Sequence, residues 1–351
     1  MKVLQLVDSP DGGGAQRLVR ELTERLPEFG SDARAVYFCN PREVRLSSRE
    51  TLPLLKRYFR KLIDEGEPFI VHSHLTWPLY YTALASGGGQ DVPLVYTEHS
   101  THNSRRDRLW LLPLERWAYR RYQRIICISE GTKVALSEWL GDELISGRSQ
   151  TIMNGSRMLA MRESHKECAR ACRLVSIGAL SSHKGFDTAL RAVAQLGDKV
   201  ARYTILGEGP ERGRLEQLVN DLGLKETVRL PGYCDDITPY LHEADLGIVP
   251  SHWEGFGLTA VEALSTGLPI VASDVMGMRE VLEDCPAVIL VAPLDASSFA
   301  DGIRYAVEHL VGRVDIAKAA RKHSEGFGIE SMVERYAAMY NQVFEDTVRN
   351  K

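Results

Sequence analysis

The feature that most constrains the fold is a glycine-broken turn between two apolar runs in the last third of the chain. Residues 246–249 are apolar and strand-like, the turn 254–257 (EGFG) follows, and helix-forming residues 260–264 lead to a second apolar run at 268–272. This order of strand, turn, helix and strand predicts a parallel crossover. The N-terminus of such a helix carries unpaired N–H groups and a partial positive charge, so we expect an anion to bind there.

Two carboxylates flank the predicted anion site. Glu254 lies in the turn and Glu262 in the helix, with seven residues between them, so both side chains can face the same space. Because carboxylates repel phosphate, the ligand is expected to carry phosphate in one part and hydroxyls in others, as a sugar nucleotide does. The alternative is an ordinary crossover whose glutamates are solvated.

Length and composition set the class of protein. At 351 residues the chain exceeds the size that one hydrophobic core usually supports, which predicts two domains, and strand and helix patterns alternate in both halves. No stretch approaches ~18 uninterrupted apolar residues, and the apolar run before Asp8 is too short for a signal peptide, so we expect a cytoplasmic protein without a transmembrane helix. A net charge of −4 is too mild to indicate nucleic acid as a partner.

The central turn carries a family resemblance. The segment PS-x-WEGFGLTAVEAL-x-x-G-x-PIVASD resembles the E-x7-E signature of the retaining glycosyltransferases of family 4 (GT4), most closely the members that build bacterial surface polysaccharides. The resemblance implies that Glu254 contacts the transferred sugar and that Glu262 contacts the nucleotide ribose. It also assigns donor binding to the turn and helix start, which comprise Gly255, Phe256, Gly257, Leu258 and Thr259.

A second glycine turn follows the apolar run at residues 3–7. In GT4 proteins a GGAE-like loop at this position faces the donor, and here it reads GGAQ, so Gly13 and Gly14 match while Gln16 departs. The GxGxxG fingerprint of dinucleotide-binding folds is absent. A simple tight turn is the alternative.

His99 is the candidate for the first domain. The strand predicted at 93–97 runs into Glu98-His99-Ser100-Thr101, and in similar polysaccharide-building proteins this histidine lies by the anomeric carbon. His99 would then bond a sugar hydroxyl, and a structural histidine is the alternative. His72 and His74 are expected to be polar loop residues rather than metal ligands.

Residues 105–121 are rich in arginine and aromatic residues. Such an amphipathic tract can lie on an anionic membrane, or it can pack its apolar face inward and solvate its arginines.

The second domain opens with Gly178-Ala179-Leu180-Ser181-Ser182-His183-Lys184-Gly185-Phe186-Asp187, which resembles the family's G-R-L-x-x-x-K-G-F-D. Gly178 and Lys184 are retained, but Ala179 stands where the family has arginine. Both cations normally offset the leaving diphosphate. Either Arg17 or His183 supplies the missing charge, or catalysis is weak or absent.

The resemblance implies a GT-B fold, with two doubly wound parallel-sheet, Rossmann-like domains facing a cleft. We expect an acceptor-side domain at 1–165, a polar linker at 156–171, a nucleotide-sugar domain at 166–329, and a last helix near 330–351 that crosses back to the first domain.

The expected function is retaining transfer of a sugar from a nucleotide diphosphate sugar to a hydroxyl of a saccharide or lipid-linked saccharide. No Asp-x-Asp pair occurs in the sequence, so we expect neither a metal nor a cofactor, and Lys184 with helix N-termini would offset the diphosphate. A non-catalytic sugar-nucleotide-binding partner and a sugar-nucleotide epimerase remain as alternatives. An NAD-type oxidoreductase is disfavoured by the missing fingerprint.

Overall fold

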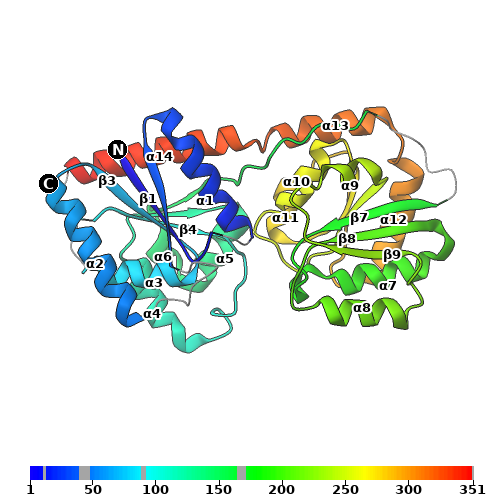
Figure 1. Ribbon diagram of the computed structural model, residues 1–351, viewed down its shortest axis with the longest axis horizontal. Coiled ribbons are helices and arrows are strands. Elements are labelled where there is room, and N and C mark those ends of the chain that lie inside the picture. Colours follow the sequence, from blue (N-terminus) through cyan, green and yellow to red (C-terminus); the bar gives the residue numbers. More distant parts are fainter. Residues whose placement is uncertain (11–12, 39–47, 88–91, 164–170, 350–351) are drawn as a thin grey trace. The chain divides into compact units, whose positions relative to one another are not determined.

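The computed structural model describes residues 1–10, 13–38, 48–87, 92–163 and 171–349. The chain forms two compact units, of which the first comprises Met1–Gly155 with Ile329–Lys351 and the second comprises Ser156–Gly328 (Figure 1).

The first unit is built on a six-stranded parallel sheet in the order β2-β1-β3-β4-β5-β6. Its strands are β1 (Lys2–Val7), β2 (Asp32–Tyr37), β3 (Phe69–His74), β4 (Leu94–Glu98), β5 (Arg124–Cys127) and β6 (Ser149–Thr151). Its helices are α1 (Gly14–Arg25), η1 (Leu26–Phe29), α2 (Ser48–Glu65), α3 (Thr76–Ala85), η2 (Leu109–Leu111), α4 (Leu112–Tyr119), α5 (Glu130–Leu140), α6 (Asp142–Ile145) and α14 (Ile329–Arg349).

The second unit repeats this plan with a six-stranded parallel sheet in the order β12-β11-β10-β7-β8-β9. Its strands are β7 (Cys172–Ile177), β8 (Val200–Leu206), β9 (Val228–Gly232), β10 (Leu246–Val249), β11 (Ile270–Ser273) and β12 (Val288–Val291). Its helices are η3 (Ser182–Lys184), α7 (Phe186–Leu196), η4 (Gly197–Lys199), α8 (Arg212–Asp221), α9 (Thr238–Glu243), α10 (Leu258–Ser265), α11 (Met276–Leu282), α12 (Ala296–His309) and α13 (Val314–Glu325).

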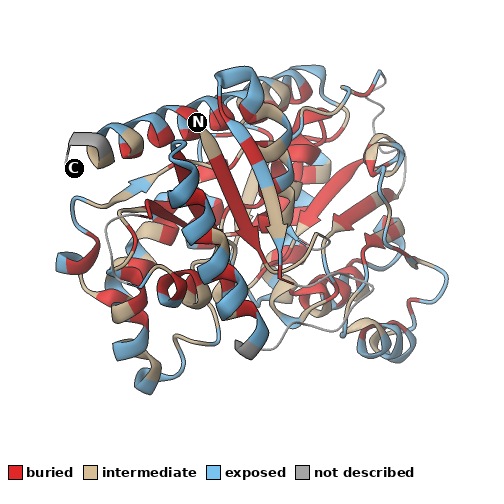
Figure 2. Ribbon diagram, turned by 60° about the vertical axis from the view of Figure 1, so that its left-hand side comes forward, coloured by how far each residue is buried: buried red, intermediate tan, exposed pale blue. Residues whose placement is uncertain are grey.

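The sheets are parallel because each crossover returns over a sheet face as a helix, which buries the central strands on both faces. Every residue of β3 and β4 is buried, and so is every residue of β11 (Figure 2). Local signals agree with this plan: the Ser129 hydroxyl accepts a hydrogen bond from Thr132 N–H and caps α5. The prediction of two α/β parallel-sheet domains is confirmed.

The division between the units differs from the expected one. The expected boundary at 165/166 lies outside the described residues, and the structure changes unit ten residues earlier, after Gly155. The physical reason is that the presumed linker packs on the second unit. Ser156 pairs with Gly328 in an isolated bridge, and the buried Arg162 donates to the carbonyl oxygens of Ala244 and Gly267.

Helix α14 belongs to the first unit. Its buried side chains join the same apolar core as Val3, Ile70 and Val95, which lie on three of the strands. Those α14 residues are Ile329, Met332, Val333, Tyr336, Ala337, Met339, Tyr340 and Val343.

Candidate functional site

The turn between β10 and α10 forms the centre of the site in the second unit. Gly257 caps α10 with a φ of +88°, a left-handed conformation that glycine adopts without strain. The first N–H groups that bond back into the helix are those of Ala260 and Val261, both to the Gly257 carbonyl oxygen. The N–H groups of Leu258 and Thr259 therefore precede the helical ladder, where an anion can be bound.

A neighbouring helix holds this turn in place. A Cβ added to Gly277 of α11 would lie 2.2 Å from the carbonyl oxygen of Glu254, so only glycine permits the approach of α11 to the turn. Phe256 is 2% exposed and packs edge-on against Phe327, with ring centroids 5.8 Å apart. The turn is thus fixed by packing on both sides.

Glu254 is paired with a cation from another loop. Its Oε1 forms an ion pair with Lys184 Nζ and accepts a hydrogen bond from Ser251 Oγ at 3.0 Å. The side chains of Lys184 and Glu254 are 19% and 13% exposed, so water screens the pair only partly. The sequence placed both residues in the site, and the structure brings them into contact.

Two loops meet here because β7 and β10 are adjacent strands. The His252 N–H donates to the His183 carbonyl oxygen at 2.7 Å, which ties the loop after β10 to the loop after β7. Gly185 has a φ of +63°, and a Cβ there would lie 2.0 Å from the Pro250 carbonyl oxygen. Both loops follow the carboxyl ends of their strands, which is where open α/β sheets bind ligands.

Glu262 is the fifth residue of α10 and is 1% exposed. Its Oε1 lies 3.5 Å from an Nη of Arg157, whose side chain is 46% exposed. A buried carboxylate needs such a partner or a hydrogen-bonding ligand. Arg157 carries no sequence signal of its own, because an isolated arginine in a polar stretch gives no pattern.

Gly178 and Ala179 lie at the end of β7. A Cβ on Gly178 would come within 3.5 Å of Lys184 Cε, so the glycine leaves room for the lysine stem. Ala179 is exposed. His183, one candidate for the missing charge, is held neutral because burial, and next the charge of Lys184, lower its pKa. His183 therefore does not replace the arginine, and the other candidate, Arg17, belongs to the first unit.

In the first unit, the glycine turn begins α1. Gly13 is the N-cap and Gly14 the first helical residue, and both are exposed. A Cβ on Gly13 would meet nothing within 4 Å, so packing does not require glycine there.

His99 lies at the end of a chain of buried polar groups that the sequence did not reveal. His72 and His74 are fully buried at the end of β3, so the expectation of loop histidines is wrong. His74 contacts His99 and Gln5, while His72 contacts Tyr340 and Thr97. Burial lowers the pKa of His72 and of His74 well below 6.5 and that of His99 to about 4, so all three rings are neutral near pH 7.

The arginines next to His99 are engaged inside the unit. Arg105 and Arg106 have side chains only 11% and 8% exposed, and both lie within 4 Å of the buried Glu98 carboxylate, at 3.9 and 3.7 Å. Arg105 also forms a 2.9 Å ion pair with Glu115. These two arginines hold the loop after β4 in place, so they are not available to a membrane surface.

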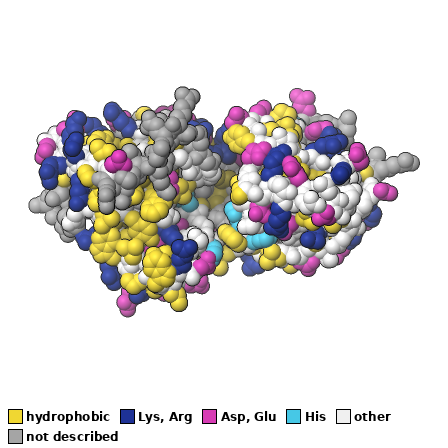
Figure 3. All heavy atoms as spheres, turned by 60° about the horizontal axis from the view of Figure 1, so that its bottom comes forward, with side chains coloured by type: hydrophobic (Ala, Val, Ile, Leu, Met, Phe, Trp, Pro, Cys, Tyr) yellow, Lys and Arg dark blue, Asp and Glu magenta, His cyan; other side chains and the backbone are white. Residues whose placement is uncertain are grey.

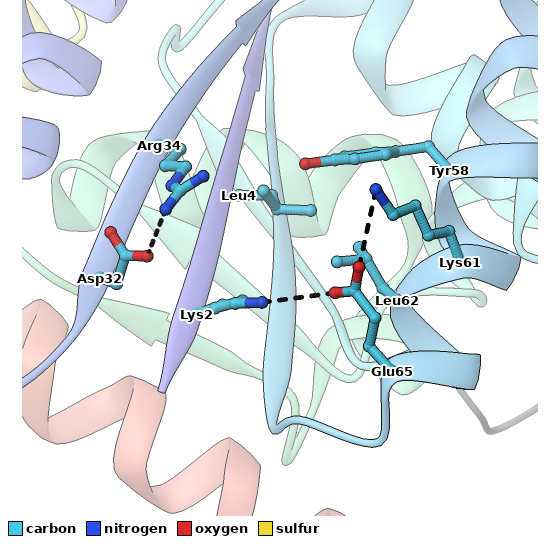
Figure 4. A pocket seen from close by; sticks show the side chains of 8 residues that line it. All are labelled: Lys2, Leu4, Asp32, Arg34, Tyr58, Lys61, Leu62 and Glu65. Atoms are coloured by element: carbon cyan, nitrogen blue, oxygen red, sulfur yellow. Dashed lines mark hydrogen bonds and ion pairs between the residues drawn. The ribbon is translucent and has the colours of Figure 1, made fainter.

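A separate cavity of about 130 Å³ lies against α2 (Figure 4). It is lined by Lys2, Leu4, Asp32, Arg34, Tyr58, Lys61, Leu62 and Glu65. Lys2 and Asp32 begin β1 and β2, so the cavity lies at the amino ends of the strands and away from the edge where such sheets bind ligands. Among the described residues, no group of three or more His, Cys, Asp or Glu side chains is placed to hold a metal ion.

Two family models match consecutive parts of the chain. Residues 160–323 match the family described as glycosyl transferases group 1, and residues 12–155 match glycosyltransferase family 4. The chain is 26% identical to glycogen synthase of Mycobacterium tuberculosis over 287 residues, which are 78% of this chain and 68% of that protein. It is 28% identical to D-inositol 3-phosphate glycosyltransferase of Paenarthrobacter aurescens over 313 residues, 80% and 76% of the two chains.

A solved structure shares the fold. HepE of Anabaena, crystallised in complex with UDP, superposes with a TM-score of 0.82 at 22% identity, covering 97% of this chain and 100% of that chain. The likeness identifies the architecture as GT-B.

Proposed function

This chain belongs to glycosyltransferase family 4 and is a glycosyltransferase, and on that premise we propose that it transfers a sugar from a nucleotide diphosphate sugar to a hydroxyl of a saccharide or lipid-linked saccharide, in glycan biosynthesis. The proposal includes retention of configuration at the anomeric carbon and chemistry without a metal ion.

The observation that carries the proposal is the contact of Lys184 with Glu254 beside the N-terminus of α10. A diphosphate needs cations and N–H donors, which Lys184 and the start of α10 offer, while a sugar needs hydrogen-bond acceptors, which Glu254 offers. Glu262, held with Arg157, offers a carboxylate to the ribose hydroxyls. These groups are drawn from adjacent strand ends within one unit.

In the proposed reaction, the bond from the anomeric carbon to the diphosphate oxygen breaks and a bond to the acceptor oxygen forms on the same face. The leaving diphosphate takes the proton of the acceptor hydroxyl. Lys184 and the backbone N–H groups of Leu258 and Thr259 offset the charge that builds on the phosphate. His99 contributes a neutral imidazole that bonds a sugar hydroxyl.

We propose a uridine diphosphate sugar as the donor. The support is the HepE protein, whose structures are described with UDP and with UDP-glucose.

A second candidate is a protein that binds the sugar nucleotide without turnover. Ala179 favours it, because one of two family cations is missing and His183 is held neutral. The two candidates differ only in whether a product forms.

The test is a panel of nucleotide diphosphate sugars, scored first by thermal shift and then by product formation with saccharide acceptors, with and without EDTA. A specific donor at ~100 times its Kd should stabilise the fold by ~2.7 kcal/mol. We expect the strongest shift from a uridine diphosphate sugar and equal turnover in EDTA. Stabilisation without any product supports the binding protein, and turnover that EDTA abolishes and Mg²⁺ restores contradicts the metal-free reaction.

A further inference from the structure

A continuous chain of hydrogen bonds runs through the first unit from His99 to α14. His99 Nε2 lies 3.1 Å from His74 Nδ1, and His74 Nε2 lies 2.8 Å from Gln5 Oε1. Gln5 Nε2 then lies 2.9 Å from the Tyr340 hydroxyl oxygen. The chain continues from Tyr340 to His72 Nδ1 at 2.5 Å, from His72 Nε2 to Thr97 Oγ1 at 2.7 Å, and from Thr97 to the Tyr336 hydroxyl at 3.3 Å.

Every member of the chain apart from His99 is fully buried, so no water competes for these bonds. A neutral imidazole has one donor and one acceptor nitrogen, which means that each ring passes on the direction of its neighbour's bond. Burial lowers the pKa of His72 and His74, so both rings stay neutral and keep this property. The donors and acceptors from His99 to Tyr340 are therefore set together, whereas the Thr97 and Tyr336 hydroxyls at the far end can rotate to follow them.

The amide of Gln5 sets that direction. Its Oε1 accepts, so His74 carries its proton on Nε2 and offers the Nδ1 lone pair to His99. His99 must then donate from Nε2, and its Nδ1 is left as an acceptor. On the other side, Gln5 Nε2 donates to the Tyr340 hydroxyl, which in turn donates to His72.

We propose that Gln5, His74 and Tyr340 are positioning residues that hold His99 in its Nε2–H tautomer, so that His99 Nδ1 is presented as an acceptor for a substrate hydroxyl. Among the described residues, no side chain bonds to His99 Nδ1, and the ring is only half-buried. A lone pair on Nδ1 selects a ligand O–H group and disfavours an anion such as phosphate or carboxylate. This inference rests on the proposed function only for the identity of that hydroxyl.

The test is a nitrogen NMR spectrum of the full-length protein labelled in its histidine side chains, with the His99 signals assigned from their loss in His99→Asn. In the wild type we expect the His99 Nε2 resonance in the protonated range and Nδ1 in the unprotonated range at pH 7. A His99 ring protonated on Nδ1, or one averaged between both tautomers, overturns the proposal. This measurement needs no activity, and its one variant, His99→Asn, leaves the buried members of the hydrogen-bond chain unchanged.

A matched pair of variants on α14 tests the role of the chain. Tyr340→Phe removes the acceptor for Gln5 Nε2, so the amide is free to reverse, and His99 should become a mixture of tautomers with kcat lower by roughly fivefold. Tyr336→Phe removes an equally buried hydroxyl from the far end of the chain, and it should leave the His99 spectrum unchanged and kcat within about twofold. Equal changes in both variants would show a merely structural role.

The outcomes separate the two proposals. If the wild-type protein transfers no sugar but His99 is in the Nε2–H tautomer, the proposed function fails and the hydrogen-bond chain stands. If sugar transfer occurs but His99 is protonated on Nδ1, the proposed role of the hydrogen-bond chain is wrong and the proposed function stands.

Discussion

At the scale of single residues, Glu254 and Glu262 have different partners, so their substitution should affect catalysis and nucleotide binding differently. Glu254→Gln should lower turnover while leaving the affinity for free nucleoside diphosphate unchanged or slightly higher, because Lys184 loses its carboxylate and can pair with phosphate. Glu262→Gln should weaken nucleoside diphosphate and donor sugar together, since its proposed partner is the ribose common to both. Calorimetry with UDP and steady-state kinetics measure the split, and equal affinity losses in both variants would contradict the assigned roles.

The missing arginine gives a second prediction. Lys184 is the retained cation of the family pair, so Lys184→Ala should reduce kcat by ~10²–10³. Ala179 is exposed, which leaves room for a longer side chain, and Ala179→Arg should raise donor affinity or rate if no other cation fills that position. Ala179→Gln, similar in length but uncharged, is the control.

Whether Ala179→Arg raises or lowers turnover shows whether another cation already takes the place of the family arginine. Unchanged or lower turnover would mean that another cation already compensates, for which Arg17 is the remaining candidate. If the wild-type protein binds the donor without transferring sugar, and the Ala179→Arg variant does transfer it, the natural protein is a sugar-nucleotide-binding protein without turnover.

The buried histidines predict how stability depends on pH. The pKa of His99 falls from 6.5 to about 4 on folding, so between these values the unfolded chain binds more protons than the folded one. The free energy of unfolding should therefore fall as the pH is lowered from 7 towards 4. Urea titrations of His99→Gln should show a slope smaller by up to ~1.4 kcal/mol per pH unit, whereas His309→Gln, which removes an exposed ring, should not. An unchanged slope in His99→Gln would contradict the lowered pKa.

At the scale of elements, the sequence predicted a strand or helix best where a regular apolar pattern ends at a glycine. The strand β10 and its glycine turn were located from an apolar run followed by two glycines. Helix α10 begins two residues before the predicted start, because Gly257 caps it in a left-handed conformation that the sequence only suggests. Helices α3 and α13 were not predicted. Helix α3 is apolar nearly all round and contains Pro78, so it shows no amphipathic stripe.

The site was predictable in its motif residues and not in their partners. Glu254 and Glu262 were found from the turn and their spacing and Lys184 from the family resemblance, while Arg157 and Gln5 were not found. Arg157 and Gln5 contact Glu262 and His74 from distant positions without a sequence pattern, and such contacts depend on which strands and helices are adjacent. The sequence motifs alone do not determine the order of the strands in each sheet.

The element after β4 gives a revised prediction about membranes. Among the described residues, no helix combines the length and hydropathy needed to cross a bilayer. In η2 and α4, however, Leu109, Trp110 and Leu114 are 75%, 72% and 45% exposed, and hydrophobic side chains gather beside basic ones on the face of the first unit turned forward in Figure 3. Arg121 lies over the Trp117 ring, with its Cζ 5.3 Å from the centroid.

We therefore expect any anionic-membrane contact to depend on Trp110 and not on Arg105 or Arg106. Trp110→Ser should reduce flotation with liposomes containing anionic lipid, and salt should do the same to the wild type. Trp253→Ser, which removes a less exposed tryptophan from the second unit, is the control. Equal binding to neutral liposomes, or none to either kind, would reject an electrostatic contact.

At the scale of the whole molecule, the two units differ in how the chain builds them. The second unit is one continuous segment, whereas the first needs α14 to complete its core. Burial of each large α14 side chain contributes ~1.5–3 kcal/mol, so their joint loss is comparable to the whole stability of a domain, about 5–15 kcal/mol.

Fragments should therefore behave unequally. Residues 156–328 alone should unfold cooperatively and bind UDP, while residues 1–155 alone should aggregate. Joining 329–351 to Gly155 through a short glycine linker should restore a folded first unit, because Ser156 and Gly328 are paired neighbours. Circular dichroism melts and light scattering measure both effects, and a stable, soluble 1–155 fragment would contradict this role of α14.

The return of α14 also has a consequence for the order of events on the ribosome. Domains usually fold as they emerge, N-terminal first. Here the first unit cannot close its core until α14 is made, and 196 further residues (156–351) follow Gly155. At about 5–20 residues per second, that delay is roughly 10–40 s, during which the second unit can finish folding first. The nascent N-terminal half is then the stretch that a chaperone has to shield.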